Sequence, residues 1–286
     1  MNFLVLGSEG QLGRAIACCR LFMDHSVFLY DKDKLDITDR NALFSFFSSN
    51  SIDAVINCAA FTNVDLCEKM KDEAHSINVC GTRNIAEAAL QHNAAMLHIS
   101  TDFVFDGEKS SPYSEEDPTD PLNYYGVTKL MSEEIVRETV PKHFIVRTSS
   151  MYSRNGSNFV KAVLKKALAD GEIAVVDDQV SCPTNADDLA EALFKLLMTE
   201  KFGTYHITDM GYCSKFEFAG FIVNYCGLSA RVIPCSSSDF KDSAVRPRFS
   251  ALDGSRFSRA SGEEMPLWQD SVKRFLDENK DLYERK

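Results

Sequence analysis

Short apolar segments alternate with helix-like segments along the first half of the chain, and this alternation constrains the fold more than any other feature. Strand-like runs lie near 2–6, 26–30, 53–57, 94–100 and 143–148, and helical patterns near 11–22, 39–49, 72–92 and 123–140. This order is typical of βαβ units that build a parallel sheet. Because such crossovers are right-handed, we expect a Rossmann-type doubly wound α/β fold with its ligand crevice at the carboxyl ends of the strands.

The second half of the chain is less regular. Helical patterns recur near 157–170, 187–199, 214–226 and 268–281, with one strand candidate at 204–208. We therefore predict a dinucleotide-binding domain over 1–150, joined by parts of 175–208, and a smaller, mostly helical substrate-binding lobe over 151–286. The loop at 234–250 is rich in Ser, Pro and Arg.

The composition excludes several classes of protein. A formal net charge of -11 argues against a nucleic-acid partner, because no basic stripe is available to neutralise phosphates. The nine cysteines form no CxxC pair and no His-Cys metal spacing, so they are typical of a reduced protein without a metal site. No apolar stretch approaches membrane-spanning length, and we expect a cytoplasmic protein with no membrane contact.

Three glycines, Gly7, Gly10 and Gly13, follow the first strand and open the first helix. In this context glycines allow a tight turn and let the backbone approach a pyrophosphate at the helix N-terminus, with Gln11 and Leu12 in the same loop. The GxxGxxG spacing differs from the commoner GxGxxG, and a glycine-rich turn can also serve packing alone. The βαβ context favours nucleotide binding.

Residues after the second and third strands would complete a dinucleotide site. The Asp31 carboxylate would accept hydrogen bonds from the adenosine ribose and favours NADH, whereas Lys32 and Lys34 would suit the 2′-phosphate of NADPH, so either cofactor is compatible. The segment after the third strand would run beside the dinucleotide, and the loop after the second strand would flank the adenine, although plain core packing would explain either segment equally well. The residues concerned are Ala59, Ala60, Phe61 and Thr62 in the first segment and Asp36 and Ile37 in the second.

Thr101, Tyr125 and Lys129 form a candidate hydride-transfer site. Tyr125 and Lys129 are four residues apart on a predicted helix, so they lie on one face. A lysine ammonium there would lower the pKa of the tyrosine towards working pH, which would make Tyr125 a proton donor. The hydroxyl of Thr101, at the end of the fourth strand, would hydrogen-bond the same carbonyl.

Several ordered motifs carry a resemblance to a known family. They are Gly7–Gly13, Leu35–Asp39, Ser100–Gly107, Tyr125–Lys129, Asp177–Val180 with Pro183 and Thr184, and Arg246 with Pro247. Over about residues 1–280 the chain resembles the dTDP-4-dehydrorhamnose reductases of the extended short-chain dehydrogenase/reductase superfamily. The resemblance implies reduction of the 4-keto group of dTDP-4-dehydro-6-deoxy-L-mannose to dTDP-L-rhamnose by NADH or NADPH. It also implies a catalytic role for Thr101, Tyr125 and Lys129, with Tyr125 and Lys129 also binding the cofactor and Lys129 holding its nicotinamide ribose. Contacts to the dTDP-sugar are implied for Thr101, Asp102, Ser150, Asn158, Phe159 and Arg246.

Two positions depart from the family pattern. Ser150 stands where the family usually has a tryptophan that packs on the substrate, and Ala15 stands where some members have a glutamate that helps bind a metal at a dimer interface. Ala15 argues against a metal-bridged dimer, which leaves a monomer or a homodimer without metal. Ser150 keeps open a reductase or epimerase for another nucleotide keto-sugar. A non-catalytic dinucleotide-binding regulatory subunit is the alternative from a different class.

Overall fold

A parallel sheet of six strands forms the centre of the molecule in the computed structural model, which describes residues 1–240 and 244–284. The strand order is β10-β5-β4-β3-β1-β2, and every neighbouring pair is parallel. The strands are β1 (Asn2–Leu6), β2 (Ser26–Tyr30), β3 (Ala54–Asn57), β4 (Ala95–Thr101), β5 (His143–Thr148) and β10 (Gly203–His206). The chain leaves β1 for β2 on one side and returns to β3 on the other, which confirms the doubly wound fold and puts its topological switch between β1 and β3.

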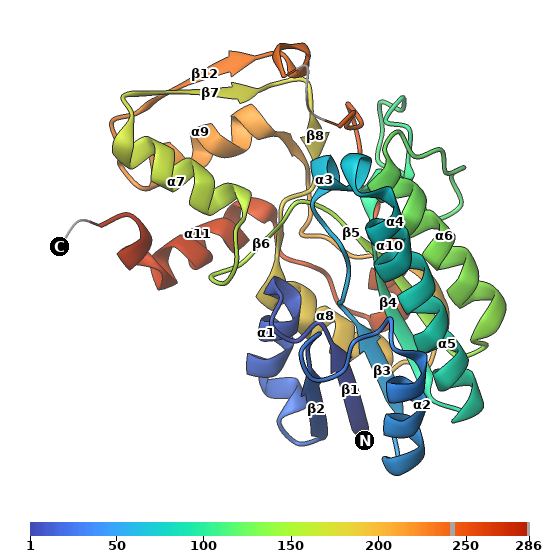
Figure 1. The fold of residues 1–286 in the computed structure, drawn as a ribbon. Coiled ribbons are helices and arrows are strands. Elements are labelled where there is room, and N and C mark those ends of the chain that lie inside the picture. The colour runs from blue at the N-terminus through green and yellow to red at the C-terminus, as the bar shows by residue number, and fades with distance from the viewer. Residues whose placement is uncertain (241–243, 285–286) are drawn as a thin grey trace.

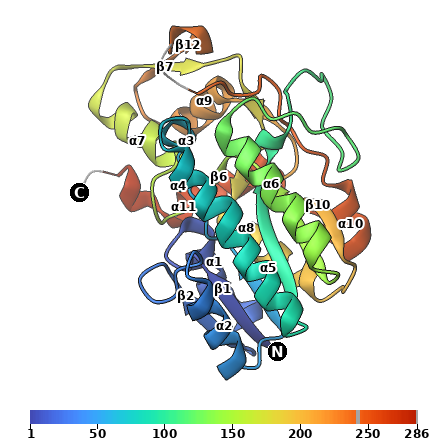
Figure 2. The same ribbon diagram turned by 45° about the vertical axis from the view of Figure 1, so that its right-hand side comes forward.

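Helices cover both faces of this sheet (Figures 1 and 2). Successive residues of β1 point to opposite faces, as the strand period requires: Phe3 and Val5 join one hydrophobic core, and Leu4 and Leu6 join the other. The first core is closed by α1 (Gln11–Cys18) and α8 (Ala186–Leu197), and the second by α2 (Arg40–Ser49), α5 (Thr82–Gln91) and α6 (Tyr124–Thr139). Both faces are buried, which explains the nearly continuous apolar runs of the strands.

The predicted helix at 72–92 is divided in the structure. It consists of α4 (Lys71–His75), a π-helical segment (Ser76–Gly81) and α5, and it is preceded by an unpredicted helix, α3 (Val64–Lys69). The predicted helix at 11–22 ends as α1 at Cys18, and a 3₁₀ turn (Arg20–Phe22) follows it.

A second layer of structure lies above the carboxyl ends of the strands (Figure 1). Three helices, α7 (Phe159–Ala169), α9 (Lys215–Tyr225) and α11 (Trp268–Glu278), pack around a separate core. The sequence did not indicate the parallel pair β7 (Glu172–Val176) and β12 (Arg231–Cys235), and β12 contains Pro234, a residue that argues against a strand. Small elements complete this part: β6 (Met151–Tyr152) with β9 (Thr184–Asn185), β8 (Val180–Ser181) with β11 (Cys213–Ser214), α10 (Ser255–Ser261), and 3₁₀ turns at Asp102–Val104, Ser237–Asp239 and Lys280–Leu282.

The chain crosses between the two layers more than once. After α7 and β7 it returns to the central sheet as α8 and β10, and α8 packs against α1. The division into a domain over 1–150 and a lobe over 151–286 stays a prediction. Within residues 1–240 and 244–284, no helix combines the length and the apolar character needed to cross a membrane.

Candidate active site

The glycine loop after β1 is built for close backbone approach. Gly7 has a φ of +77°, and a Cβ atom there would lie 2.7 Å from the backbone nitrogen of Ala59 at the end of β3. Gly13 lies against the same turn, where a Cβ atom would be 2.3 Å from the carbonyl oxygen of Gly7. Gly10 is the N-cap of α1 and contributes no capping side chain, so the first N–H groups of the helix remain free to bind an anion.

A cavity of about 570 Å³ opens at this loop, at the switch point of the sheet. It brings together seven of the predicted cofactor residues: Gly7, Gly10, Asp31, Asp36, Ile37, Ala59 and Ala60. Cys58 and Lys32 also line it. The free helix N-terminus, the glycine cradle and the volume all fit a dinucleotide, with its pyrophosphate at the start of α1.

Seven predicted cofactor residues do not line this cavity: Gln11, Leu12, Gly13, Phe61, Thr62, Tyr125 and Lys129. The side chain of Leu12 is buried in the core between α1 and α8, and Gly13 serves helix–strand packing. The side chain of Gln11 accepts hydrogen bonds from Ser153 Oγ (3.2 Å) and Asn158 Nδ2 (3.1 Å). Gln11 therefore ties the glycine loop to the segment before α7.

The Asp31 carboxylate is fixed at the end of β2. It accepts hydrogen bonds from the backbone N–H groups of Glu9 (2.9 Å) and Lys32 (2.8 Å). These two bonds hold the carboxylate at the rim of the cavity. The preference for NADH that Asp31 suggested stays a prediction, because Lys32 lines the same cavity.

The three candidate catalytic residues come from β4 and α6. Thr101 is the last residue of β4, and its hydroxyl donates to Asp102 Oδ1 (3.1 Å) and accepts from the backbone N–H of Phe103 (3.2 Å). Tyr125 lies in the first turn of α6, which Asn123 caps through a bond from the N–H of Gly126. One turn later, Lys129 is buried beneath it.

The expected effect of Lys129 on Tyr125 is not found. Burial raises the pKa of Tyr125 well above its usual value, the carboxylate of Asp102 adds to that shift, and only the hydroxyl of Thr101 opposes it. Lys129 is not among the groups that shift this tyrosine. Burial instead lowers the pKa of Lys129 to about 8, against a smaller opposing effect of Glu133. Tyr125 therefore holds its proton firmly, and Lys129 is the group that titrates near neutral pH.

The side-chain nitrogen Nζ of Lys129 lies 3.1 Å from Nε2 of the buried His98. The backbone N–H of Ala59 donates to Asn57 Oδ1, which identifies the other end of the Asn57 amide as its nitrogen. That amide nitrogen lies 3.2 Å from His98 Nδ1 and donates to it, so Nδ1 is the acceptor of the ring. Nε2 then carries the hydrogen and donates it to Ser132 Oγ (2.9 Å). Burial and Lys129 together keep the pKa of His98 far below its ordinary value, so Lys129 lies beside a neutral ring.

An ion pair without access to solvent supports the site from below. Glu133, one turn after Lys129 on α6, accepts two hydrogen bonds from the Arg147 guanidinium at 2.9 and 2.7 Å and a third from Ser100 Oγ at 2.5 Å. The pair fixes α6 against the ends of β4 and β5. Thr101 and Tyr125 are thereby held in a fixed relation to one another.

The residues predicted to contact substrate are divided among different surroundings. Asp102 is buried and accepts from Ser149 Oγ (2.8 Å) and Ser250 Oγ (2.6 Å), while burial raises its pKa despite these bonds. Ser150 has a φ of +42° and bonds Ser181 Oγ at 2.7 Å. Ser150 and Phe159 line a cavity of about 190 Å³, and Lys215 closes it on one side.

Asn158 does not join them. Its amide nitrogen donates to Gln11 Oε1 and to the carbonyl oxygen of Ser153, and its amide oxygen caps α7 by accepting from the N–H of Lys161. These bonds hold the side chain of Asn158 between the glycine loop and the start of α7, and the substrate contact that the resemblance implied stays a prediction.

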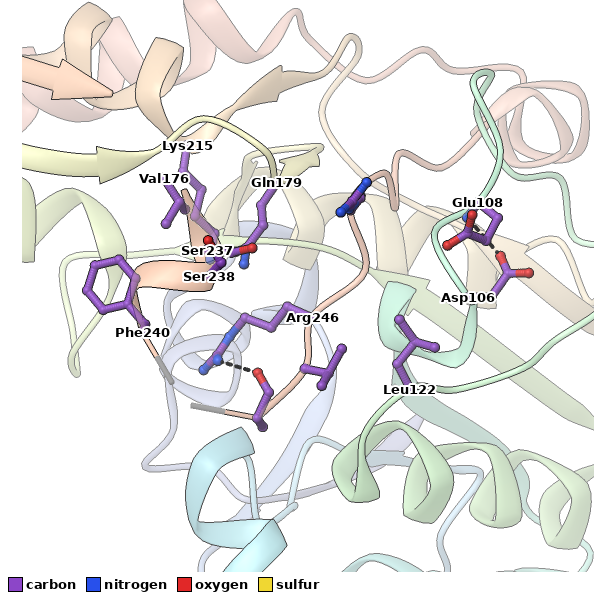
Figure 3. Close-up of a pocket in the computed structure, with 13 residues that line it drawn as sticks. Asp106, Glu108, Leu122, Val176, Gln179, Lys215, Ser237, Ser238, Phe240 and Arg246 are labelled. Atoms are coloured by element: carbon purple, nitrogen blue, oxygen red, sulfur yellow. Dashed lines mark hydrogen bonds between the residues drawn. The ribbon is translucent and has the colours of Figure 1, made fainter. Parts of the chain in front are cut away.

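A larger cavity of about 720 Å³ lies between the loop before α6 and the upper layer (Figure 3). Lys215, Gln179 and Arg246 lie on one side of it, and Asp106 and Glu108 lie on the other. The guanidinium of Arg246 bonds Asp65 of α3 (3.0 Å) and the carbonyl oxygen of Ala244 (2.9 Å). Among residues 1–240 and 244–284, no group of three or more His, Cys, Asp and Glu side chains is arranged to hold a metal ion.

Sequence reasoning missed three residues of this region: Asn78, His98 and Lys215. Asn78 holds the segment after β3 through the N–H (2.7 Å) and carbonyl oxygen (3.2 Å) of Phe61, and it donates to Thr128 Oγ1 (2.9 Å), between Tyr125 and Lys129 on α6. It lies in the π-helical segment, for which the sequence carried no signal. A histidine in an apolar strand was the available signal for His98.

The doubly wound sheet, the glycine loop at its switch point and the Thr-Tyr-Lys set define a protein of the nicotinamide-dependent oxidoreductase class with a Rossmann-type fold. Residues 1–280 match the family described as the RmlD substrate binding domain. The chain is 37% identical to the spore coat polysaccharide biosynthesis protein SpsK of Bacillus subtilis, over 96% of each chain. It is 36% identical to the dTDP-4-dehydrorhamnose reductase of Aggregatibacter actinomycetemcomitans, over 95% of this chain and 97% of that one.

A solved structure agrees with these sequence matches. The crystal structure of the dTDP-4-dehydrorhamnose reductase of Bacillus anthracis in complex with NADP superposes with a TM-score of 0.94 at 36% identity, and the match covers 98% of this chain and 100% of that one. The chain belongs to the dTDP-4-dehydrorhamnose reductase family.

Proposed function

We propose that the protein reduces the 4-keto group of dTDP-4-dehydro-6-deoxy-L-mannose to give dTDP-L-rhamnose, with NADPH or NADH as the reductant. The observation that supports this proposal is the set of Thr101, Tyr125 and Lys129 at the end of β4 and in α6, in a member of this family whose dinucleotide-sized cavity is lined by Cys58, a residue that interacts with Lys129. Gly7, Gly10, Asp31 and Ala59 would hold the cofactor. When bound, the reduced nicotinamide supplies the hydride.

The chain's own residues supply the proton. Tyr125 holds its proton tightly in the free protein, so the acid is fully loaded before reaction, and negative charge on the substrate oxygen draws that proton across. The hydroxyl of Thr101, which donates to Asp102 in the free protein, would turn its hydrogen to the same substrate oxygen and add a second hydrogen bond. Lys129, whose pKa of about 8 lies near neutral pH, would be available to return a proton to Tyr125 after the transfer.

The test is oxidation of NADPH with the dTDP-keto-sugar, followed by the absorbance of the reduced nicotinamide. Tyr125→Phe should lower kcat by about 10²–10⁴-fold and leave the affinity for NADPH unchanged, because the proton is transferred only in the transition state. Tyr124→Phe is the matched control: that ring lies against Lys71, and the variant should keep wild-type turnover. Near-normal turnover by Tyr125→Phe would show that another group is the acid.

A second candidate is reduction or epimerisation of another nucleotide keto-sugar. The cavity of about 190 Å³ beside Ser150 favours it, because that cavity leaves room for a differently shaped sugar. A panel of nucleotide keto-sugars distinguishes the two. Cofactor binding without turnover on any of them would point to a non-catalytic protein. A cytoplasmic location and a monomeric or metal-free dimeric state stay predictions.

A further inference from the structure

His98 occupies the middle of a buried hydrogen-bond chain that runs from the cofactor cavity to Lys129. The chain begins at Ala59, which lines that cavity and whose backbone N–H donates to Asn57 Oδ1 (3.1 Å). Asn57 Nδ2 donates to His98 Nδ1 (3.2 Å), and His98 Nε2 lies 3.1 Å from Lys129 Nζ. Asn57, His98 and Lys129 are at most 2% exposed. The chain thereby joins β3, β4 and α6 behind the part of the cavity wall that Ala59 forms.

The position of the hydrogen on the His98 ring is fixed independently from two sides. Asn57 donates to Nδ1, so the hydrogen of the neutral ring lies on Nε2. Ser132 gives the same result. Its one hydroxyl hydrogen goes to the carbonyl oxygen of Lys129 (2.6 Å), which leaves its oxygen to accept from Nε2 (2.9 Å). The ring therefore presents an N–H, and not a lone pair, to Lys129 Nζ.

An N–H at this position distinguishes the two forms of Lys129. The ammonium has three donors and no acceptor, so it cannot accept the hydrogen of Nε2. The uncharged amine has a lone pair, and it can share that hydrogen with Ser132 Oγ. Because a hydrogen bond to one form of a titrating group favours that form, His98 favours the uncharged amine of Lys129.

Two further groups act on Lys129, from α6 and from the segment after β3. The carboxylate of Glu133 on α6 is bonded to the guanidinium of Arg147 of β5, so its charge is already balanced. Burial raises the pKa of Cys58 to about 12, which keeps this residue a thiol. Burial also keeps the pKa of His98 far below its ordinary value, so the ring stays neutral. His98 therefore acts on Lys129 through a fixed hydrogen and not through a charge.

We propose that His98 is a positioning residue for the reaction: its Nε2–H fixes the place of Lys129 Nζ relative to the end of β3 and favours the uncharged amine. Lys129 takes this form when it gives a proton to Tyr125. An O–H bond then forms on the phenolate oxygen, an N–H bond of the ammonium breaks, and the lone pair left on Nζ accepts from His98. Water returns a proton to the amine before the next turnover. The step at Tyr125 rests on the proposed function, whereas the effect of His98 on Lys129 does not.

Two substitutions separate the roles of the ring nitrogens. In His98→Gln the amide nitrogen takes the place of Nε2, and Ser132, whose hydroxyl hydrogen is already donated, keeps that nitrogen turned towards Lys129. In His98→Asn the amide oxygen takes the place of Nδ1 and keeps the bond from Asn57, but Nε2 is lost. The two variants therefore differ in the one hydrogen that faces Lys129.

The measurement is a pH titration of the lysine Cε signals by NMR of isotopically labelled protein, with the Lys129 signal identified by its loss in Lys129→Met. The wild-type signal should titrate at about pH 8, and His98→Gln should match it. His98→Asn should raise the midpoint by about one pH unit, a tenfold change in proton affinity, as the loss of one buried hydrogen bond predicts. His143→Asn is the matched control on β5: that ring bonds the carbonyl oxygen of Val140, and the variant should match wild type.

Equal midpoints in His98→Asn and His98→Gln would overturn the proposal. If His98→Asn is unfolded by circular dichroism, Ser132→Ala decides the question without altering the ring. The hydrogen of Nε2 is then left to Lys129 alone, so the midpoint should fall below that of wild type. A Ser132→Ala midpoint at or above the wild-type value would also overturn the proposal.

Turnover distinguishes this inference from the proposed function. Activity should be lost as pH rises through the midpoint of Lys129, because the amine has no proton to return, and His98→Asn should move this limb of kcat upwards by the same pH unit with KM for the keto-sugar unchanged. If wild type turns over no keto-sugar but the two His98 variants differ in their titration, the proposed function fails and the effect of His98 on Lys129 stands. Turnover with coinciding titrations gives the reverse.

Discussion

The ion pair of Glu133 with Arg147 offers a sharp test of how this site is held together. The Glu133 side chain is 0% exposed and that of Arg147 is 4% exposed, and two hydrogen bonds join them. Glu133→Gln keeps the shape but leaves the guanidinium buried without its counter-charge. Removing one partner of a buried pair costs about 3–5 kcal/mol. With a urea slope of about 3 kcal/mol per M, the smaller figure lowers the unfolding midpoint by about 1 M.

The matched control is Glu134→Gln, one residue along α6 and exposed to solvent, which should change the free energy of unfolding by less than about 0.5 kcal/mol. The assay is urea unfolding followed by circular dichroism. A double variant, Glu133→Leu with Arg147→Met, removes both charges and should recover part of the loss. If Glu133→Gln loses no more stability than Glu134→Gln, the pair does not hold α6 as argued.

Two further predictions concern stability. Gly13→Ala should lower the free energy of unfolding by about 1–3 kcal/mol, because the added Cβ would meet the Gly7 carbonyl oxygen. Gly220→Ala has open space around it and should raise the free energy of unfolding by about 0.5–1 kcal/mol. Melting temperatures that shift in the same direction for both variants would contradict this reasoning. Burial, followed by the charge of Asp188, raises the pKa of Asp209 from 3.8 to about 8 in the folded protein. The folded state therefore favours the protonated carboxyl. Its contribution to the free energy of unfolding is fully present below about pH 3.8 and is lost as pH rises through about 8. Asp209→Asn should remove that decline, and denaturation curves at pH 5 and 9 that change equally in both proteins would refute it.

Much of the fold could be predicted because its signals are local. Strands β1 to β5 and helix α6 follow directly from apolar runs and helical periodicity, and Asn123 caps α6 by a bond within four residues. The glycine loop is similarly local, since the turn after β1 requires the positive φ of Gly7. Chemistry that depends on spacing along one helix, such as Tyr125 with Lys129, was available for the same reason.

Only the tertiary structure decided which of these residues act on one another. The pKa of Lys129 and of Tyr125 depends on burial and on Asp102 and Glu133, and no spacing along the chain reports burial. The pairing of Arg246 with Asp65 joins positions 181 residues apart. Whether such a charge is free or neutralised depends on what the whole fold brings within hydrogen-bonding distance.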